Sequence, residues 1–139
     1  MNLSNHVISF NKLITSISEN NYFLTTPIQA KENRVSVHLT SGKNKKEVKI
    51  EIVNYDDVKR LFMTIVIINI PYKTVDDFIS FDIYLKKNTI EYPEILEGEE
   101  RTEEKIEHYI KNCSELFKTY GVKLINTDEQ FPGYYPEWT

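Results

Sequence analysis

Two six-residue segments near the middle of the chain alternate strictly between apolar and polar residues, and they constrain the fold more than any other feature. They are residues 34–39 and 47–52, and a polar stretch at 41–45 separates them. Strict alternation is typical of a β-strand with one buried face, since successive side chains point to opposite sides of a sheet. The segments predict a hairpin whose buried face consists of Val35, Val37, Leu39, Val48, Ile50 and Ile52.

Two other segments predict strands on either side of this hairpin in the sequence. Residues 22–26 are rich in aromatic and β-branched side chains and end at Pro27. Residues 61–70 form the longest apolar run and also fit a helical stripe, but the β-branched residues at 64–68 favour a strand. Because this run is apolar without interruption, we expect a central strand that helices cover on both faces.

The third quarter of the chain predicts a second hairpin. Residues 79–85 alternate again, and residues 89–92 return after a short polar turn. Near the end of the chain, residues 122–125 predict a short edge strand.

Two segments carry apolar residues at helical spacing. Residues 3–19 place apolar side chains three and four positions apart, which predicts an amphipathic helix. A longer helix is predicted between Thr102, a suitable N-cap residue, and Gly121, a suitable C-terminal residue. Its apolar stripe comprises Ile106, Tyr109, Ile110, Cys113, Leu116, Phe117 and Tyr120. Together the elements predict an α+β fold: an antiparallel sheet of about five to six strands, with an N-terminal helix and a long C-terminal helix packed on it.

Composition bounds the class of protein. The chain has 139 residues, so we expect residues 1–139 to form a single domain, and its 40% hydrophobic content with four glycines argues against disorder. Its one cysteine, Cys113, cannot form an internal disulfide. Neither a secretory leader nor an apolar stretch long enough to cross a bilayer is recognisable. We therefore expect a protein of the reducing cytoplasm without membrane contact.

The charge balance favours a protein partner over a nucleic acid. The formal net charge is −4, whereas binding to phosphates needs Lys and Arg gathered on one face. A small basic group lies in the first predicted hairpin, at Lys43, Lys45, Lys46 and Lys49. No aromatic residue lies beside it to stack on a base, so we interpret these lysines as keeping a sheet edge soluble.

No set of residues forms a known metal, nucleotide or thiol site. Glu104 and His108 are one helical turn apart, but a metal needs a third ligand and the helix offers only Asn112 at the next turn, so a loose surface pair is the better interpretation. Cys113 lies in an apolar stripe, which favours a buried core thiol over a nucleophile. Glycine-rich phosphate-binding motifs are absent from the sequence. We therefore predict no metal and no cofactor.

Acid–base catalysis has few candidates. The three histidines are His6, near the chain terminus, His38, on the polar face of a strand, and His108, and no spacing links them. The paired acids at 56–57 and 76–77 are interpreted as turn and cap residues. We therefore predict no catalytic residue and a protein that is not an enzyme.

Two features suggest partner binding. An acidic run extends from Glu94 to Glu107, interrupted among charged residues only by Arg101 and Lys105, and it suits a basic partner surface as well as a solvated helix start. Aromatic residues gather near the C-terminus, from Phe131 onwards, and either pack back onto the sheet or bind a partner. The predicted partner-binding residues are Glu99, Glu100, Glu103, Glu104, Tyr134, Tyr135 and Trp138.

Small size, acidity, the α+β pattern and a Lys-, Asn- and Ile-rich bacterial composition together resemble, in general character, the cytoplasmic immunity proteins that neutralise bacterial toxins. The resemblance implies stoichiometric binding: carboxylates steer the chain onto a basic toxin domain, and aromatic side chains seal the contact and occlude the toxin's active site.

Two alternatives stay open. A chaperone of the type III secretion class has a similar order of helix, three strands, helix, two strands and helix, and such chaperones are homodimers. A small enzyme of unrecognised fold would bring His38 or His108 to a carboxylate inside a pocket. The chain is accordingly expected to be a monomer or a homodimer.

Overall fold

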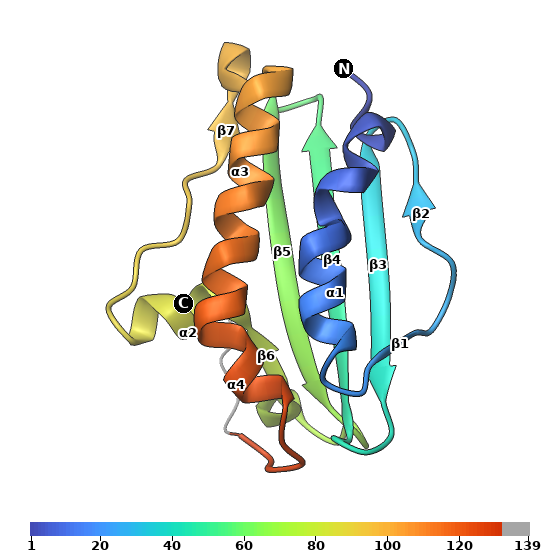
Figure 1. Cartoon of the computed structure of the whole chain (residues 1–139). Helices are drawn as coiled ribbons and strands as arrows, with labels where there is room; N and C mark the ends of the chain where they lie inside the picture. Colours follow the sequence, from blue (N-terminus) through green and yellow to red (C-terminus); the bar gives the residue numbers. More distant parts are fainter. Residues whose placement is uncertain (132–139) are drawn as a thin grey trace.

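The structure, a computed structural model, describes residues 1–131 as a twisted antiparallel sheet with helices packed across one face (Figure 1). Three long strands form its centre: β3 (Arg34–Ser41), β4 (Lys46–Tyr55) and β5 (Arg60–Asn69). All of β3 pairs with β4, and all of β4 pairs with β5. The predicted first hairpin and the strand at 61–70 are confirmed. The six apolar residues predicted for the hairpin's buried face are all at most 1% exposed.

Shorter strands complete the two edges of the sheet. On the outer edge of β3 lie β1 (Phe23–Leu24) and β2 (Gln29–Ala30). On the outer edge of β5 lie β6 (Phe78–Ser80), preceded by the 3₁₀ turn η2 (Val75–Asp77), and β7 (Leu96–Glu97). The strand predicted at 22–26 is therefore present but two residues long.

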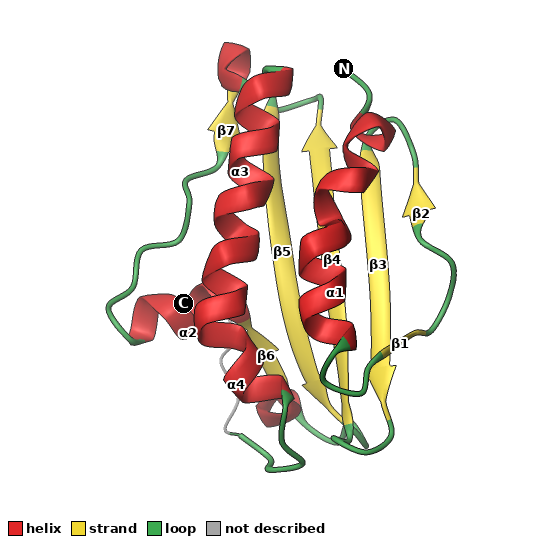
Figure 2. Cartoon of the chain, in the orientation of Figure 1, coloured by secondary structure: helices red, strands yellow, loops and turns green. Residues whose placement is uncertain are grey.

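The helical layer consists of an N-terminal and a C-terminal helix that run in the same direction across the sheet (Figure 2). The N-terminal helix begins as the 3₁₀ segment η1 (Leu3–Phe10) and continues as α1 (Asn11–Ser18). The C-terminal helix comprises α3 (Glu103–Leu116), the π-helical turn η4 (Phe117–Gly121) and α4 (Val122–Ile125). Thr102 caps α3 by accepting a hydrogen bond from the Lys105 amide. The predicted α+β fold with both helices is confirmed.

The prediction that the C-terminal helix ends at Gly121 and that an edge strand follows is wrong. The helix continues to Ile125, because Leu124 and Ile125 are buried beneath it and hold the last turn against the core. Gly121 does not end the helix, and its missing side chain instead leaves room for a neighbouring ring. A Cβ atom at this position would overlap the Phe117 ring, so glycine lets that ring pack against the helix backbone.

The second predicted hairpin is also wrong. Only residues 78–80 form a strand, and Phe81–Lys87 form the helix α2. Phe81 and Leu85 are both 0% exposed, and their spacing of four lets both enter the core from one side of a helix. The Phe81 ring meets the Phe117 ring edge-on, with centroids 4.9 Å apart. Burial against the C-terminal helix thus overrides the alternating pattern.

Two tyrosine hydroxyls form hydrogen bonds with a part of the outer edge of β5 that no strand of residues 1–131 pairs with. Between its pairing with β7 and its pairing with β6, Met63 has no strand partner on the outer side. The Met63 amide donates to the Tyr109 hydroxyl at 2.9 Å, and the Met63 carbonyl accepts from the Tyr92 hydroxyl at 3.1 Å. Both backbone groups are therefore satisfied without a neighbouring strand.

The expectation that helices cover β5 on both faces is wrong. Leu61, Met63, Ile65 and Ile67 point toward the helices and are buried, but the residues between them are half-buried on the opposite face. On that face β5 contributes Phe62, Thr64, Val66 and Ile68, and β4 contributes Glu47, Lys49 and Glu51. One apolar side is enough to hold β5, since the alternation of a strand buries only every second residue.

Lys46 is buried, which corrects the interpretation of the basic hairpin as an exposed edge. Its side chain is 0% exposed and its Nζ donates to the carbonyls of Thr127 at 2.5 Å, Glu129 at 2.7 Å and Asn44 at 3.3 Å. The ammonium also lies 5.7 Å from the centre of the Phe131 ring. Burial lowers the pKa of Lys46, and the nearby carboxylates of Asp128 and Glu129 oppose that shift. This lysine attaches the segment after α4 to the start of β4.

Replacing Tyr109 by Phe tests the closure of the sheet edge. We expect Tyr109→Phe to lower the free energy of unfolding by about 1–3 kcal/mol, because the Met63 amide is left buried without an acceptor. Denaturant unfolding of the variant measures the change. Tyr72→Phe is the matched control, because Tyr72 is 55% exposed and should change stability by less than about 0.5 kcal/mol. Equal effects of the two substitutions would contradict the role of Tyr109.

Replacing Lys46 by Met tests the attachment of the C-terminal segment. Lys46→Met keeps the length of the side chain but leaves three carbonyls without their donor, so we expect a loss of about 1–3 kcal/mol. Lys49→Met, on the half-buried face, removes only a surface ion pair with Glu47 at 3.8 Å and should cost at most about 1 kcal/mol. Unfolding by urea compares the two. A smaller loss for Lys46→Met than for Lys49→Met would refute the attachment.

Candidate functional site

One buried histidine joins the N-terminal helix to α3. His6 is 2% exposed and lies between two carboxylates that are one helical turn apart. Its Nδ1 is hydrogen-bonded to Oε1 of Glu107 at 2.5 Å, and its Nε2 lies 2.5 Å from Oε2 of Glu103 without hydrogen-bond geometry. The imidazole thus lies between the two carboxylates, one of which it meets through a hydrogen bond.

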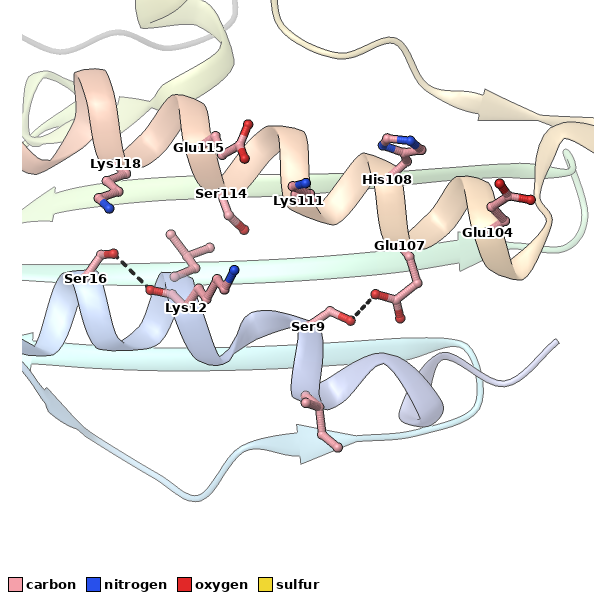
Figure 3. Close-up of a pocket in the computed structure, with 12 residues that line it drawn as sticks. Ser9, Lys12, Ser16, Glu104, Glu107, His108, Lys111, Ser114, Glu115 and Lys118 are labelled. Carbon is pink, nitrogen blue, oxygen red and sulfur yellow. Dashed lines mark hydrogen bonds between the residues drawn. The ribbon is translucent and has the colours of Figure 1, made fainter.

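Glu107 receives a second contact from the N-terminal helix. The Ser9 hydroxyl donates to its other carboxylate oxygen (Figure 3). Partial burial by itself raises the pKa of Glu107, but the hydrogen bonds from Ser9 and His6 and the charge of His6 outweigh it and hold the pKa below its ordinary value. Glu103 and Glu107 thus fix the start of α3 against η1.

His6 is a residue whose position the sequence analysis missed. It was placed near a chain terminus, yet it lies in η1 with Leu3 three positions before it and Phe10 four positions after it, both buried. That spacing on the apolar stripe was the available signal, together with two acids four positions apart on the second helix.

The predicted acidic residues lie at one end of the molecule. Glu99 and Glu100 are exposed in the short 3₁₀ helix η3 (Gly98–Glu100), and Glu104 is exposed in the first turn of α3. Glu103 differs from them, because it contacts His6. The turn between β4 and β5, with Asp56 and Asp57, reaches the same end, as Figure 1 shows. We call this region, residues 55–60 and 94–104, the acidic end.

Arginines at the acidic end are already engaged within the chain. Arg101 donates to the Asn54 side chain at 2.7 Å and to the Gly98 carbonyl at 2.8 Å, and it lies 3.6 Å from Asp56. Arg60 pairs with Glu97 at 3.4 Å. The exposed carboxylates of Glu99, Glu100 and Glu104 have no ion pair with another residue of the described chain, so the acidic end keeps a negative potential.

The acidic end also carries exposed apolar side chains. The rings of Tyr55 and Phe62 stack with centroids 5.4 Å apart, and Tyr55 is 42% exposed. Val58, in the β4–β5 turn, is 61% exposed, and Ile95, just before β7, is 43% exposed. These three residues give no signal in the sequence, because isolated apolar residues at strand ends and in loops are common.

A groove of about 630 Å³ separates the N-terminal helix from α3. Ile8, Lys12 and Leu13 line one wall, and residues from Glu104 to Lys118 line the other (Figure 3). Every residue that lines the groove belongs to η1, α1, α3 or η4, so the groove lies in the helical layer.

The structure also places the three other candidate residues, Cys113, His108 and His38. Cys113 is buried beside Tyr92 and Tyr109, as predicted, and burial raises the pKa of its thiol to about 12. His108 lies on the wall of the groove and His38 on the half-buried sheet face. Neither forms an ion pair with a carboxylate of the described residues. Within residues 1–131, no three His, Cys, Asp or Glu side chains gather as metal ligands.

One of the four C-terminal aromatic residues, Phe131, lies within the described residues. Phe131 packs over Lys46, and its carbonyl accepts a hydrogen bond from Asn69 at 3.2 Å. The predicted partner-binding residues Tyr134, Tyr135 and Trp138 lie outside the described residues.

Comparison with known proteins identifies no relative. No protein-family model matches the chain, and neither does any curated protein or solved structure. Among the helices of the described chain, none combines the length and the apolar character needed to span a bilayer.

The contacts of Glu107 predict a pH-dependent effect on stability. The pKa of Glu107 is lower in the folded chain than its ordinary value of 4.5. Its carboxylate therefore stabilises the fold at any pH above that ordinary value, and the stabilisation is lost as the pH falls through the pKa of the folded chain. Glu107→Gln should therefore be less stable than the parent chain at pH 7 but similar to it in strong acid. Thermal unfolding across pH measures the difference. Glu115→Gln, exposed on the same helix, is the control, and a pH-independent loss in Glu107→Gln would refute the assignment.

Proposed function

We propose that the chain binds a basic protein partner through its acidic end, as an immunity protein that neutralises a cognate toxin by stoichiometric binding in the cytoplasm. The observation that carries the proposal is that exposed apolar side chains, Tyr55 among them, and exposed carboxylates occur at the same end of the molecule. Stable protein interfaces have this composition: a small apolar centre that loses its water and a polar rim that remains wet.

The carboxylates raise the rate of association and orient the partner as it approaches. Glu99, Glu100 and Glu104 attract a positively charged surface over several ångströms, and their effect falls as salt screens the charges. The arginines at this end oppose the attraction little, since Arg60 and Arg101 are paired with groups of their own chain.

The exposed apolar side chains slow the dissociation of the complex. Tyr55 is supported from below by its stack on Phe62, so its ring is held in place before a partner arrives. A ring that is already ordered loses little conformational entropy on binding. Inhibition follows if the toxin surface that covers Tyr55 includes or adjoins its active site.

Affinity purification of the full chain from its native lysate, followed by mass spectrometry, tests the proposal first. We expect one basic protein with a folded toxin domain, at one copy for each copy of this chain. Recovery of an acidic partner, or of a nucleic acid, would contradict the charge argument.

Charge reversal then tests the surface with the captured partner. Glu99→Lys/Glu100→Lys should lower the association rate about tenfold at low salt and change the dissociation rate little. Tyr55→Ala should raise the dissociation rate about tenfold. The control Glu19→Lys/Glu91→Lys makes the same charge change at exposed positions outside the acidic end and should bind nearly as well as the parent chain. Surface plasmon resonance separates the two rates, and equal rates for all three variants would exclude the acidic end.

A second candidate is a chaperone of the type III secretion class, and the order of elements favours it. When the short strands β1, β2 and β6 are set aside, the order is a helix, three long strands, a short helix, one short strand and a helix, and the second pair of strands of that class is reduced to β7. Such chaperones are homodimers. A homodimer that carries a secreted effector would favour the chaperone, and a monomer that binds one basic toxin domain would favour the immunity protein.

A further inference from the structure

The groove between the two helices has charges of opposite sign at its two ends. Glu104 and Glu107 lie at the end where α3 begins, and Lys111 and Lys118 lie further along the same wall (Figure 3). Lys12 adds a third ammonium from the facing wall, while Glu115 is the one carboxylate among these lysines. The groove thus changes from acidic to basic along its length.

The charged groups needed for recognition are available. Lys12, Lys111, Lys118 and Glu104 are exposed and form no ion pair with any other residue between 1 and 131. Glu107, in contrast, is held by Ser9 and His6. His108 lies between the two ends.

Apolar surface lies between the charges. Leu13 forms part of the wall and is buried, whereas Ile8 is 78% exposed and is the most exposed large apolar side chain in the described chain. The methylene stems of the lysines add apolar surface along the walls.

We propose that this groove binds one amphipathic α-helix of a partner protein, oriented antiparallel to α1 and α3. Side chains of the partner helix spaced three and four apart would enter the groove and cover Ile8. The carboxylates of its first turns would face Lys111 and Lys118, and basic residues of its last turn would face Glu104.

The direction follows from the electrostatics of helices. A helix ordinarily carries acidic residues in its first turn and basic residues in its last turn, matching its macrodipole. The two walls run in the same direction, so both of their C-terminal ends lie at the lysine end of the groove (Figure 1). An antiparallel partner opposes both dipoles and satisfies both sets of charges, whereas a parallel partner satisfies neither.

The length of the partner segment follows from the length of the groove wall that α3 and η4 form. Residues 104 to 118 rise about 21 Å along an α-helix, so the partner needs about four turns to contact both ends. This surface shares Glu104 with the acidic end but does not include Tyr55, Val58 or Ile95, and the inference does not depend on the function proposed for the acidic end.

Two stapled peptides of equal helicity test the inference directly. Both carry leucines at helical spacing over four turns. The first has glutamates in its first turns and lysines in its last turns, and the second has these charges exchanged. Fluorescence anisotropy with the full chain should show at least about tenfold tighter binding of the first peptide, the effect of two modest ion pairs. Equal binding of the two peptides, or binding of neither, would overturn the proposal.

Charge exchange in the groove locates the binding. The variant Glu104→Lys/Lys111→Glu/Lys118→Glu should reverse the preference and bind the second peptide more tightly. Lys31→Glu/Lys43→Glu, at exposed lysines away from the groove, should leave the preference unchanged. A preference that the groove variant does not reverse would place the peptide elsewhere and refute the inference.

A second copy of this chain is the competing occupant. Sedimentation velocity of the parent chain and of Ile8→Glu distinguishes the two cases. A monomeric parent chain leaves the groove free, as proposed. A dimer that Ile8→Glu dissociates would show that the groove is already filled by another copy, and would overturn the assignment of a partner helix.

Discussion

The structure depends on the burial of one side of the three long central strands of the antiparallel sheet beneath two helices that run in the same direction. The strands β3, β4 and β5 pair along nearly their full length, so their register is fixed by continuous hydrogen bonding and by the alternation of apolar side chains. A slip of one residue would turn Val37, Ile50 and Ile65 away from the helices. Every other part of the fold is arranged around this buried side, including the short edge strands and the groove between the helices.

The fold class and the long elements could be predicted because their patterns are strong. Each long pattern allows one secondary structure. Strict alternation predicts strands over 34–39 and 47–52, and the apolar stripe after Thr102 predicts a helix. Short segments were less predictable. The alternation at 79–85 fits a strand, but Phe81 and Leu85 also lie four apart, and only the position of the Phe117 ring decides for a helix. Local sequence does not contain that tertiary contact.

The candidate site was predictable in part, for a related reason. Exposed carboxylates can be read from an acidic run, and Glu99, Glu100 and Glu104 are indeed at the surface. The same run gives no sign that Glu103 and Glu107 contact His6, because the contact joins residues about a hundred positions apart. Lys46 was misread for the converse reason. A lysine beside other lysines suggests solvent, and only the return of the segment after α4 supplies the carbonyls that enclose it.

The enclosure of Lys46 also makes it a natural reporter of motion at the C-terminal side of the fold. An amine reagent needs a free, uncharged amino group, and the Nζ of Lys46 is surrounded by the carbonyls of Thr127 and Glu129 while the segment is in place. Lys43 and Lys45, in the same hairpin, are exposed and react without any opening. The ratio of labelling at these neighbouring lysines therefore measures how often the segment after α4 leaves the sheet while the rest of the chain stays folded.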